Sequence, residues 1–264
     1  MNIVITGSSK GIGYALAEEF AKYNDQIVIS SRNLEAINKA VNKLTTDYPK
    51  VEIFGTVCDV SKPENIKKLI EFSKEKLESI DLWINNAGTN ASMYDNLLSF
   101  SDEDLKQIVD TNLLGTLYCC KEALKLMKQQ GYGHIFNISG MGYKGNASAN
   151  LAAYGATKCA VSQLTKTLAK ENKKSGIGFH TLLPGMTLTD LFLNNISPEA
   201  GKIFNILGDT AENVSMFLVP KIRKIKGTGK VINYLSSAKA FWKFSTAGRR
   251  KNKFFDSDGN LISE

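Results

Sequence analysis

The pair Tyr154 and Lys158 is the part of this 264-residue sequence best suited to chemistry. Apolar residues at helical spacing, among them Val161 and Leu168, predict a helix over residues 152–172. Residues i and i+4 of a helix lie one turn apart on one face, so we expect the Lys158 ammonium beside the Tyr154 hydroxyl. A free tyrosine has a pKa of about 10, and a nearby cation lowers it toward the range of efficient acid–base catalysis. The same spacing also occurs on ordinary amphipathic helices, so the interpretation depends on what precedes it.

A glycine-rich turn near the start of the chain predicts a nucleotide site. Residues 2–6 form a short apolar strand, and residues 6–13 (TGSSKGIG) then open a helix that continues to about residue 23. Glycine permits a tight turn and close backbone approach, and a helix N-terminus attracts a pyrophosphate. At the first strand-to-helix junction this pattern favours a dinucleotide over a simple turn.

The end of the second strand indicates which dinucleotide. That strand covers residues 26–30 and runs into Ser31, Arg32 and Asn33. NAD enzymes usually place an acidic residue here to bind the ribose 2′-hydroxyl, and this sequence has none. Arg32 and Lys10 offer two cations for a 2′-phosphate instead. Either cation alone would be an ordinary solvated residue, but the two together predict NADP(H).

The remaining strands and helices alternate along the chain. Alternation of this kind predicts an α/β fold, with a doubly wound parallel sheet of about seven strands in a single Rossmann-type domain over residues 1–264. A long helix is expected over residues 101–129, interrupted at Gly115. The further strands are expected over residues 51–57, 81–85, 133–138, 177–183 and 231–235.

Residues 190–220 are expected to form a mobile helical lid for a large substrate, since they are rich in apolar side chains.

A basic C-terminal extension follows over residues 236–264. From Lys221 to Phe255 there are eleven Lys or Arg and no Asp or Glu, so the net charge of +7 less these eleven leaves −4 elsewhere. Cations here alternate with aromatics. We expect first an amphipathic helix that packs its aromatics on the body, second contact with an anionic membrane, and only distantly nucleic acid, for which no recognition motif is present.

Composition excludes several classes of protein. The chain is 43% hydrophobic and 22% charged, which is typical of a globular protein rather than a disordered one. The four cysteines lack metal-binding spacing and are expected to be reduced, and no metal site is predicted. Residues 1–7 already form a predicted strand and turn with no signal or transit peptide before them, so we expect a cytoplasmic protein or a processed form.

Together these motifs, with Asn86-Ala87-Gly88 after the fourth strand and Asn112 on the long helix, resemble the short-chain dehydrogenase/reductase family over most of residues 1–190. The resemblance implies that Tyr154 donates and accepts the proton, that Lys158 lowers the Tyr154 pKa and holds the nicotinamide ribose, and that Asn112 positions a water in a proton relay. It also implies a homo-oligomer, a dimer or tetramer, that packs the helices over residues 101–129 and 152–172 on a partner.

The predicted cofactor site combines the residues derived above with those that the resemblance implies. Asp59 is placed to accept from the adenine amino group, and residues 184–189 face the nicotinamide carboxamide by resemblance. The predicted cofactor-binding residues are Gly7, Ser9, Lys10, Gly11, Ile12, Gly13, Ser31, Arg32, Asn33, Asp59, Val60, Asn86, Ala87, Gly88, Tyr154, Lys158, Pro184, Gly185, Met186, Thr187 and Thr189. The predicted catalytic residues are Tyr154, Lys158, Asn112 and Ser139.

One position departs from the family pattern. The family usually has a serine three residues after the asparagine of the fifth strand, and counting from Asn137 puts Gly140 there. Either the loop moves Ser139 into that role, or Ser148 or Asn146 supplies the hydroxyl or amide, or the substrate needs no such donor.

The loop at residues 139–142 and the segments at 184–191, 226–235 and 254–259 look like the chlorophyll b reductase group of this family. That resemblance implies NADPH-dependent reduction of a carbonyl on a bulky apolar substrate, as in conversion of a 7-formyl to a 7-hydroxymethyl group. The alternatives are reduction of another bulky apolar carbonyl, such as a steroid or polyketide, and a cofactor-binding regulatory protein without turnover.

Overall fold

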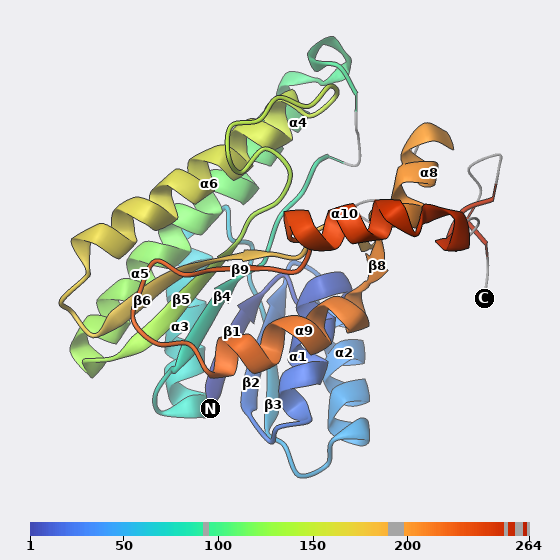
Figure 1. Cartoon of the computed structure of the whole chain (residues 1–264). Coiled ribbons are helices and arrows are strands. Elements are labelled where there is room, and N and C mark those ends of the chain that lie inside the picture. Colours follow the sequence, from blue (N-terminus) through green and yellow to red (C-terminus); the bar gives the residue numbers. More distant parts are fainter. Residues whose placement is uncertain (92–94, 190–197, 251–252, 257–260, 263–264) are drawn as a thin grey trace.

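In the computed structural model of this chain, seven strands form one parallel sheet between two layers of helices (Figure 1). The structure describes residues 1–91, 95–189, 198–250, 253–256 and 261–262. The strand order is β3-β2-β1-β4-β5-β6-β9, so the winding reverses between β1 and β4. Open sheets of this kind bind ligands at the carboxyl ends of the strands near such a reversal. The strands are β1 (Asn2–Thr6), β2 (Gln26–Ser31), β3 (Ile53–Val57), β4 (Leu82–Asn85), β5 (Gly133–Ile138), β6 (Ile177–Leu183) and β9 (Val231–Asn233).

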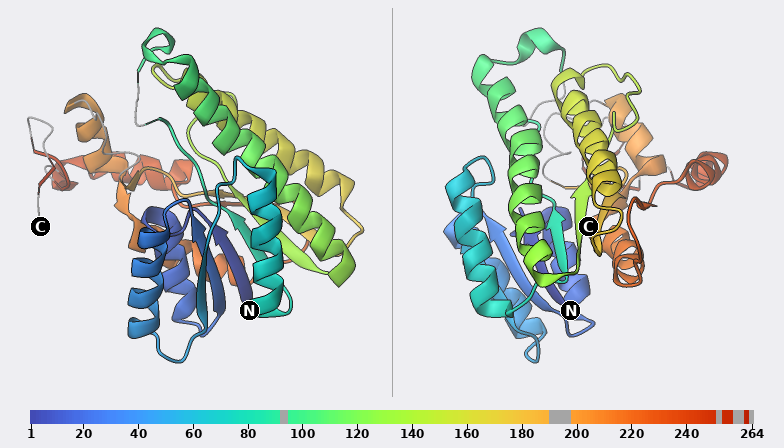
Figure 2. Two further views of the ribbon diagram at one scale, coloured as in Figure 1. Left: turned by 180° about the vertical axis from the view of Figure 1, so that it is seen from behind. Right: turned by 90° about the vertical axis from the view of Figure 1, so that its left-hand side faces the viewer.

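The sheet has a hydrophobic core on each face because successive strand residues point to opposite sides. In β1, Ile3 and Ile5 pack in one core while Val4 packs in the other. Burial on both faces explains why the strands are almost continuously apolar. Helices α1 (Gly11–Ala21), α2 (Leu34–Asp47) and α9 (Ala211–Arg223) cover the first face, and α3 (Pro63–Leu77), α5 (Gly115–Gln130) and α6 (Ala152–Glu171) cover the second (Figure 2).

The predicted fold is confirmed, and the predicted limits of β1, β5 and β6 are correct. The long helix expected over residues 101–129 is divided before Gly115 rather than at it. Helix α4 (Asp102–Val109) ends in a π-helical turn, Asp110–Leu114, from which α5 continues. Widened turns of this type occur mostly at functional sites.

Between β6 and β9, the described residues form two short strands and two helices. Strands β7 (Thr187–Leu188) and β8 (Asp209–Thr210) pair in parallel, and α8 (Pro198–Leu207) lies between them in the chain. Helix α9 buries Val214, Leu218 and Ile222 against α1. Helix α9 is therefore packed on the core, whereas a lid formed by residues 190–220 stays a prediction, and residues 190–197 of that prediction lie outside the described residues.

Helix α10 (Ser237–Ser245) is oriented opposite to the first expectation for the tail. Phe241, Trp242 and Phe244 are 77%, 56% and 51% exposed, whereas Lys243 is 2% exposed. The expectation that this helix packs its aromatics on the body and solvates its charges is wrong, because polar partners on the body bind Lys243. In Figure 1, α10 crosses beside α8 and β8 at one end of the sheet. No helix in the described part of the chain has both the length and the hydrophobicity needed to cross a bilayer.

Candidate active site

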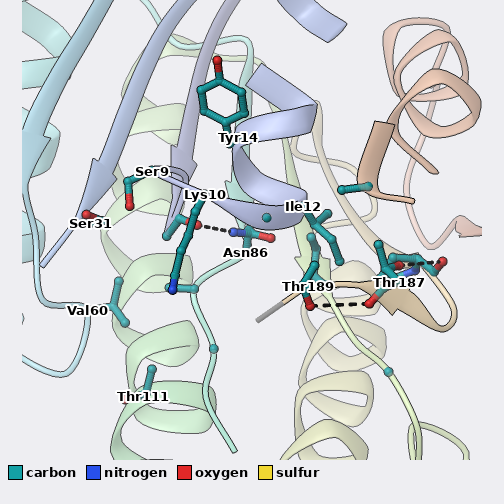
Figure 3. Close-up of a pocket in the computed structure, with 18 of the residues that line it drawn as sticks. Ser9, Lys10, Ile12, Tyr14, Ser31, Val60, Asn86, Thr111, Thr187 and Thr189 are labelled. Atoms are coloured by element: carbon teal, nitrogen blue, oxygen red, sulfur yellow. Dashed lines mark hydrogen bonds between the residues drawn. The ribbon is translucent and has the colours of Figure 1, made fainter. Parts of the chain in front are cut away.

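A cavity of about 710 Å³ follows the carboxyl ends of strands β1 to β6. It extends from Arg32 at one end to Tyr154 and Lys158 at the other, and Figure 3 shows the part around the glycine-rich turn. The structure brings every predicted cofactor-binding residue to its lining except Gly13. Of the four predicted catalytic residues, Asn112 alone is absent from the lining.

Gly13 and Asn86 shape the turn from behind. A Cβ on Gly13 would lie 2.4 Å from Asn86 Nδ2 and 2.6 Å from the Gly7 carbonyl oxygen, so no side chain fits there. Asn86 Nδ2 donates to the carbonyl oxygens of Thr6 and Gly7 over 2.9 and 2.7 Å, which fixes the turn (Figure 3). The N-cap Lys10 makes no side-chain bond to the first turn of α1. The first backbone amides of α1 therefore receive no cap from the Lys10 side chain. Amides at a helix N-terminus can bind a phosphate.

The far end of the cavity carries Lys10 and Arg32, together with Ser31 and Asn33. Asp59 and Glu212 are the acidic residues of the lining. Asp59 Oδ1 accepts hydrogen bonds from the backbone N–H and the hydroxyl of Ser61, which orients the carboxylate. A glycine turn at a helix N-terminus and two cations beyond it fit a phosphorylated dinucleotide.

Tyr154 and Lys158 stand at the other end, on the first turns of α6. Lys158 is 5% exposed, its Nζ lies 5.4 Å from the centroid of the Tyr154 ring, and it donates to the Ile138 carbonyl oxygen over 3.3 Å. Burial lowers the pKa of Lys158 to about 8. At neutral pH most of the population still carries the ammonium, so a positive charge is held beside the phenol.

Asn112 lies in the π-helical turn and is 1% exposed. Its Oδ1 accepts from the Thr89 N–H over 2.7 Å, and its Nδ2 donates to the Thr89 carbonyl over 2.8 Å and to Thr157 Oγ1 over 3.2 Å. A Cβ on Gly88 would lie 3.3 Å from Asn112 Oδ1 and 3.5 Å from Lys158 Nζ, so both side chains approach that glycine. The amide therefore ties the loop after β4 to α6 directly behind the cavity wall.

Ser139 and Gly140 follow β5 and differ in what they face. Ser139 is 1% exposed, and its hydroxyl donates to the Lys158 carbonyl oxygen over 3.0 Å. A Cβ on Gly140 would stand 3.1 Å from the Tyr154 hydroxyl oxygen. The position beside the phenol thus belongs to a residue without a side chain, while the Ser139 hydroxyl is bound to the backbone of α6.

A family model described as short chain dehydrogenase matches residues 1–200. This chain belongs to the short-chain dehydrogenase family. The resemblance drawn from its motifs is thereby confirmed.

Among relatives, the chain is 43% identical over 277 residues to a probable chloroplastic chlorophyll(ide) b reductase of Oryza sativa subsp. japonica, covering 99% of this chain and 55% of that one. It is 44% identical over 265 residues to a chloroplastic chlorophyll(ide) b reductase of Arabidopsis thaliana, covering 96% and 76%. This chain thus spans little more than half the length of the rice relative. An actinorhodin polyketide ketoreductase solved with NADPH has the same fold, with a TM-score of 0.78, 24% identity and coverage of 90% and 96%.

This short-chain dehydrogenase has a second cavity of about 660 Å³ that shares Gly140, Met141, Leu151, Gly185 and Met186 with the first. Its wall is formed by the loop after β5, by α8 and by the segment after β9. Among the described residues, Lys144 is the one charged side chain in the lining, and none of their carboxylates contributes. The other lining residues include Tyr143, Asn146, Ser148, Leu183, Ile203, Leu207 and Leu235.

Several residues of the site are absent from the prediction. Thr111, Met141 and Leu151 line the first cavity, and Thr89 and Thr157 hold the Asn112 amide. Thr111 and Thr157 are sequence neighbours of Asn112 and Lys158, so adjacency to the motifs was an available signal. Nothing in the sequence indicates that Thr89 faces Asn112. Within the described residues, no cluster of three or more His, Cys, Asp or Glu is arranged to hold a metal ion.

Proposed function

We propose that this short-chain dehydrogenase reduces a carbonyl group of a bulky apolar substrate with NADPH. The observation that carries the proposal is the place of the Tyr154 hydroxyl, which lies beside Gly140. Gly140 lines both the groove that fits a dinucleotide and the apolar cavity, to which no carboxylate of the described residues contributes. The names of its relatives, chlorophyll(ide) b reductases, suggest a formyl group on a chlorin-like ring system as the substrate.

Tyr154 carries the proton in the proposed mechanism. NADPH, when bound, supplies the hydride for the carbonyl carbon. The Tyr154 hydroxyl donates its proton to the carbonyl oxygen, and the Lys158 ammonium stabilises the phenolate that remains. Gly140, Gly185 and Met186 line both cavities, and the acceptor carbonyl is expected beside them.

Ser139 takes a positioning role in this proposal rather than a substrate-binding one. The Ser139 hydroxyl already donates to the backbone carbonyl of Lys158, so Ser139 holds the helix that carries Tyr154, the proposed general acid. Gly140 leaves the space beside the Tyr154 hydroxyl for the substrate. Ser148 and Asn146 line the apolar cavity and remain the candidates for a second polar contact with the substrate. Asn112 acts from behind by tying α6 to the loop after β4.

NADPH rather than NADH is proposed because the pocket end next to Ser31 combines Lys10 with Arg32 and holds no acidic residue from position 30 to 33. A guanidinium binds phosphate through two parallel N–H donors. A carboxylate, which would favour a 2′-hydroxyl, would repel the 2′-phosphate. The structure of the ketoreductase with NADPH supports this proposal by its fold only.

Two other functions stay as alternatives. Reduction of a steroid or polyketide carbonyl would use the same groups, because the second cavity suits any large substrate of low polarity rather than one particular ring system. A regulatory protein that binds the cofactor without turnover would need no phenol beside the buried ammonium, so the pairing of Tyr154 with Lys158 favours the enzyme.

Peripheral membrane contact and self-association are proposed for different surfaces. The exposed aromatics of α10 lie within the basic tail, a combination that favours the headgroup region of an anionic membrane. Exposed Val109 and Leu117, together with the outer side of α6, support a homo-oligomer formed through α4, α5 and α6. A cytoplasmic location is consistent with both and stays an expectation.

A substrate panel tests the proposal directly. Purified protein is mixed with NADPH or NADH and with chlorophyllide b, a steroid ketone or 4-nitrobenzaldehyde, and oxidation of the cofactor is followed with product analysis. We expect turnover with NADPH and a higher kcat/KM for chlorophyllide b than for 4-nitrobenzaldehyde. Tight cofactor binding without oxidation across the panel would favour the regulatory alternative.

A further inference from the structure

The buried amine of Lys243 joins the C-terminal extension to the wall of the active site. Its Nζ donates to the Leu207 carbonyl over 2.9 Å, to the Gly208 carbonyl over 3.2 Å and to Asp209 Oδ2 over 3.3 Å. An ammonium has three N–H donors, and these contacts account for three. Two of the acceptors are carbonyls at the C-terminus of α8, where a cation is favoured by the helix dipole.

Asp209 is the centre of the same cluster. Tyr234 Oη donates to Asp209 Oδ2 over 2.5 Å, and Asn213 Nδ2 donates to Oδ1 over 2.9 Å. Burial alone would raise the pKa of this carboxyl. The hydrogen bonds from Tyr234 and Asn213 and the nearby Lys243 outweigh that effect and hold the pKa well below its usual range. Asp209 is therefore held as a hydrogen-bonded carboxylate inside the protein.

The cluster reaches the active site through β7 and β8. The Asp209 N–H donates to the Met186 carbonyl over 3.0 Å, and Thr187 pairs with Asp209 in the two-stranded sheet. Met186 and Thr187 line the cofactor cavity, and Met186 and Leu207 line the apolar cavity. One carboxylate and one ammonium therefore connect α10 to the segment that both cavities share.

A second set of hydrogen bonds joins α8 to residues near the C-terminus of the chain. Asn205 Oδ1 accepts from the N–H groups of Phe254 and Phe255, and its Nδ2 donates to the Phe255 carbonyl over 2.7 Å. Phe254 and Phe255 then pack their rings against Phe204 at centroid distances of 5.4 and 5.6 Å. Helix α8 is thus held from the C-terminal side at two points.

We propose that Lys243 is a positioning residue for substrate binding, acting through Asp209 and α8 on the Met186–Thr187 segment and the apolar cavity. The C-terminal extension is then part of the substrate site without touching the reacting atoms. This inference rests on the proposed function for its kinetic consequence, but its structural consequence is independent of any activity.

The test replaces Lys243 by Met in the full chain, which keeps the aliphatic stem and removes the ammonium. Lys226→Met is the matched control, because it removes the same charge at an exposed lysine between α9 and β9. Amide hydrogen exchange is measured on peptides covering residues 184–189, 200–210 and 11–21. Removing hydrogen bonds to a charged group should accelerate exchange in the first two by about tenfold or more, with no change in α1 or in the control.

Kinetics provide a second readout. We expect Lys243→Met to raise the KM for chlorophyllide b by about tenfold while the kcat changes less than threefold, and to raise the KM for 4-nitrobenzaldehyde by a smaller factor, because a small aldehyde does not fill the apolar cavity. Lys243→Arg, which keeps the charge, should recover part of the loss. Equal losses for both aldehydes together with faster exchange in α1 would mean general destabilisation and overturn the proposal, as would unchanged exchange at residues 184–189.

Two further outcomes are also decisive. If Lys243→Met does not fold, Asp209→Asn replaces it, and the same local exchange pattern is expected because the carboxylate is lost from the same cluster. If the wild-type protein reduces none of the aldehydes, the proposed function fails, whereas the exchange measurement still decides whether Lys243 holds the Met186–Thr187 segment.

Discussion

The hydroxyl of Ser139 donates a hydrogen bond to the backbone carbonyl of Lys158, 3.0 Å away. This contact joins the end of β5 to the helix that carries Tyr154, and it leaves Gly140 beside the Tyr154 hydroxyl. Ser139→Ala removes one neutral hydrogen bond, for which a loss of about 0.5–1.5 kcal/mol is typical. We therefore expect kcat to fall by no more than about tenfold, as measured by NADPH oxidation under saturating substrate.

Ser148→Ala is the paired variant for this measurement, because Ser148 lines the apolar cavity and is exposed. A loss of more than about a thousandfold in kcat for Ser139→Ala would be the size expected of an acid–base group and would contradict its positioning role.

Arg32→Asp should change the cofactor preference. A carboxylate at this end of the cavity repels a 2′-phosphate and can accept from a 2′-hydroxyl. The ratio of kcat/KM for NADPH to that for NADH should fall by at least about tenfold, which corresponds to about 1.4 kcal/mol. Lys39→Asp makes the same charge change on the exposed side of α2 and should leave the ratio unaltered. Equal effects of the two variants would mean that Arg32 acts only through net charge.

The lowered pKa of Lys158 predicts a pH limit. Because the folded-state pKa is about 8, below the ordinary lysine value, the ammonium loses its proton as the pH rises through that value. Reduction needs the charged form, so kcat/KM should decline above about pH 8, since this parameter reports the free enzyme. Lys158→Arg keeps its charge at higher pH, so the decline of kcat/KM should move to a higher pH even if the variant is slower than wild type. Lys166→Arg, on the exposed side of α6, is the control. If kcat/KM of Lys158→Arg declines at the same pH as in wild type, Lys158 is not the group that causes the decline.

The exposed aromatics of α10 predict binding to anionic vesicles. With each basic residue near the headgroups worth about 1 kcal/mol, the protein should sediment with vesicles of phosphatidylserine and phosphatidylcholine at low salt and be released at high salt. Replacing Phe241, Trp242 and Phe244 by Ser should abolish sedimentation without changing 4-nitrobenzaldehyde reduction. Tyr132→Ser, at another exposed aromatic, should not. If the wild-type protein stays in the supernatant with vesicles at low salt, the prediction of membrane contact is wrong.

The sheet and the cofactor groove could be predicted because their signals are local. Strands of a parallel sheet are buried on both faces, so β1, β5 and β6 are largely apolar, and they are followed by Gly7, Ser139 and Pro184. The groove follows from residues placed directly after those strands, such as Gly7 and Asn86. Once the strand order is parallel, these positions must meet at one edge of the sheet.

The parts that could not be predicted depend on contacts between distant residues. Whether α10 buries its lysine or its aromatics is decided by Asp209, 34 positions before Lys243. The π-helical turn depends on Thr89 and Thr157, which hold the Asn112 amide from two other elements. An apolar stretch such as residues 211–220 looks the same in sequence whether it covers a substrate or packs on α1.

Tyr154→Phe tests the central claim most directly, because it removes one oxygen and leaves the ring against Lys158. NADPH binding, followed by fluorescence titration, should stay within about threefold of wild type, since the groove from Gly7 to Arg32 is untouched. Carbonyl reduction, followed by NADPH oxidation and product analysis, should fall by about 10²- to 10⁴-fold, the range that general acid catalysis contributes. Reduction within tenfold of wild type, with binding intact, would contradict the assignment of Tyr154 as the proton donor.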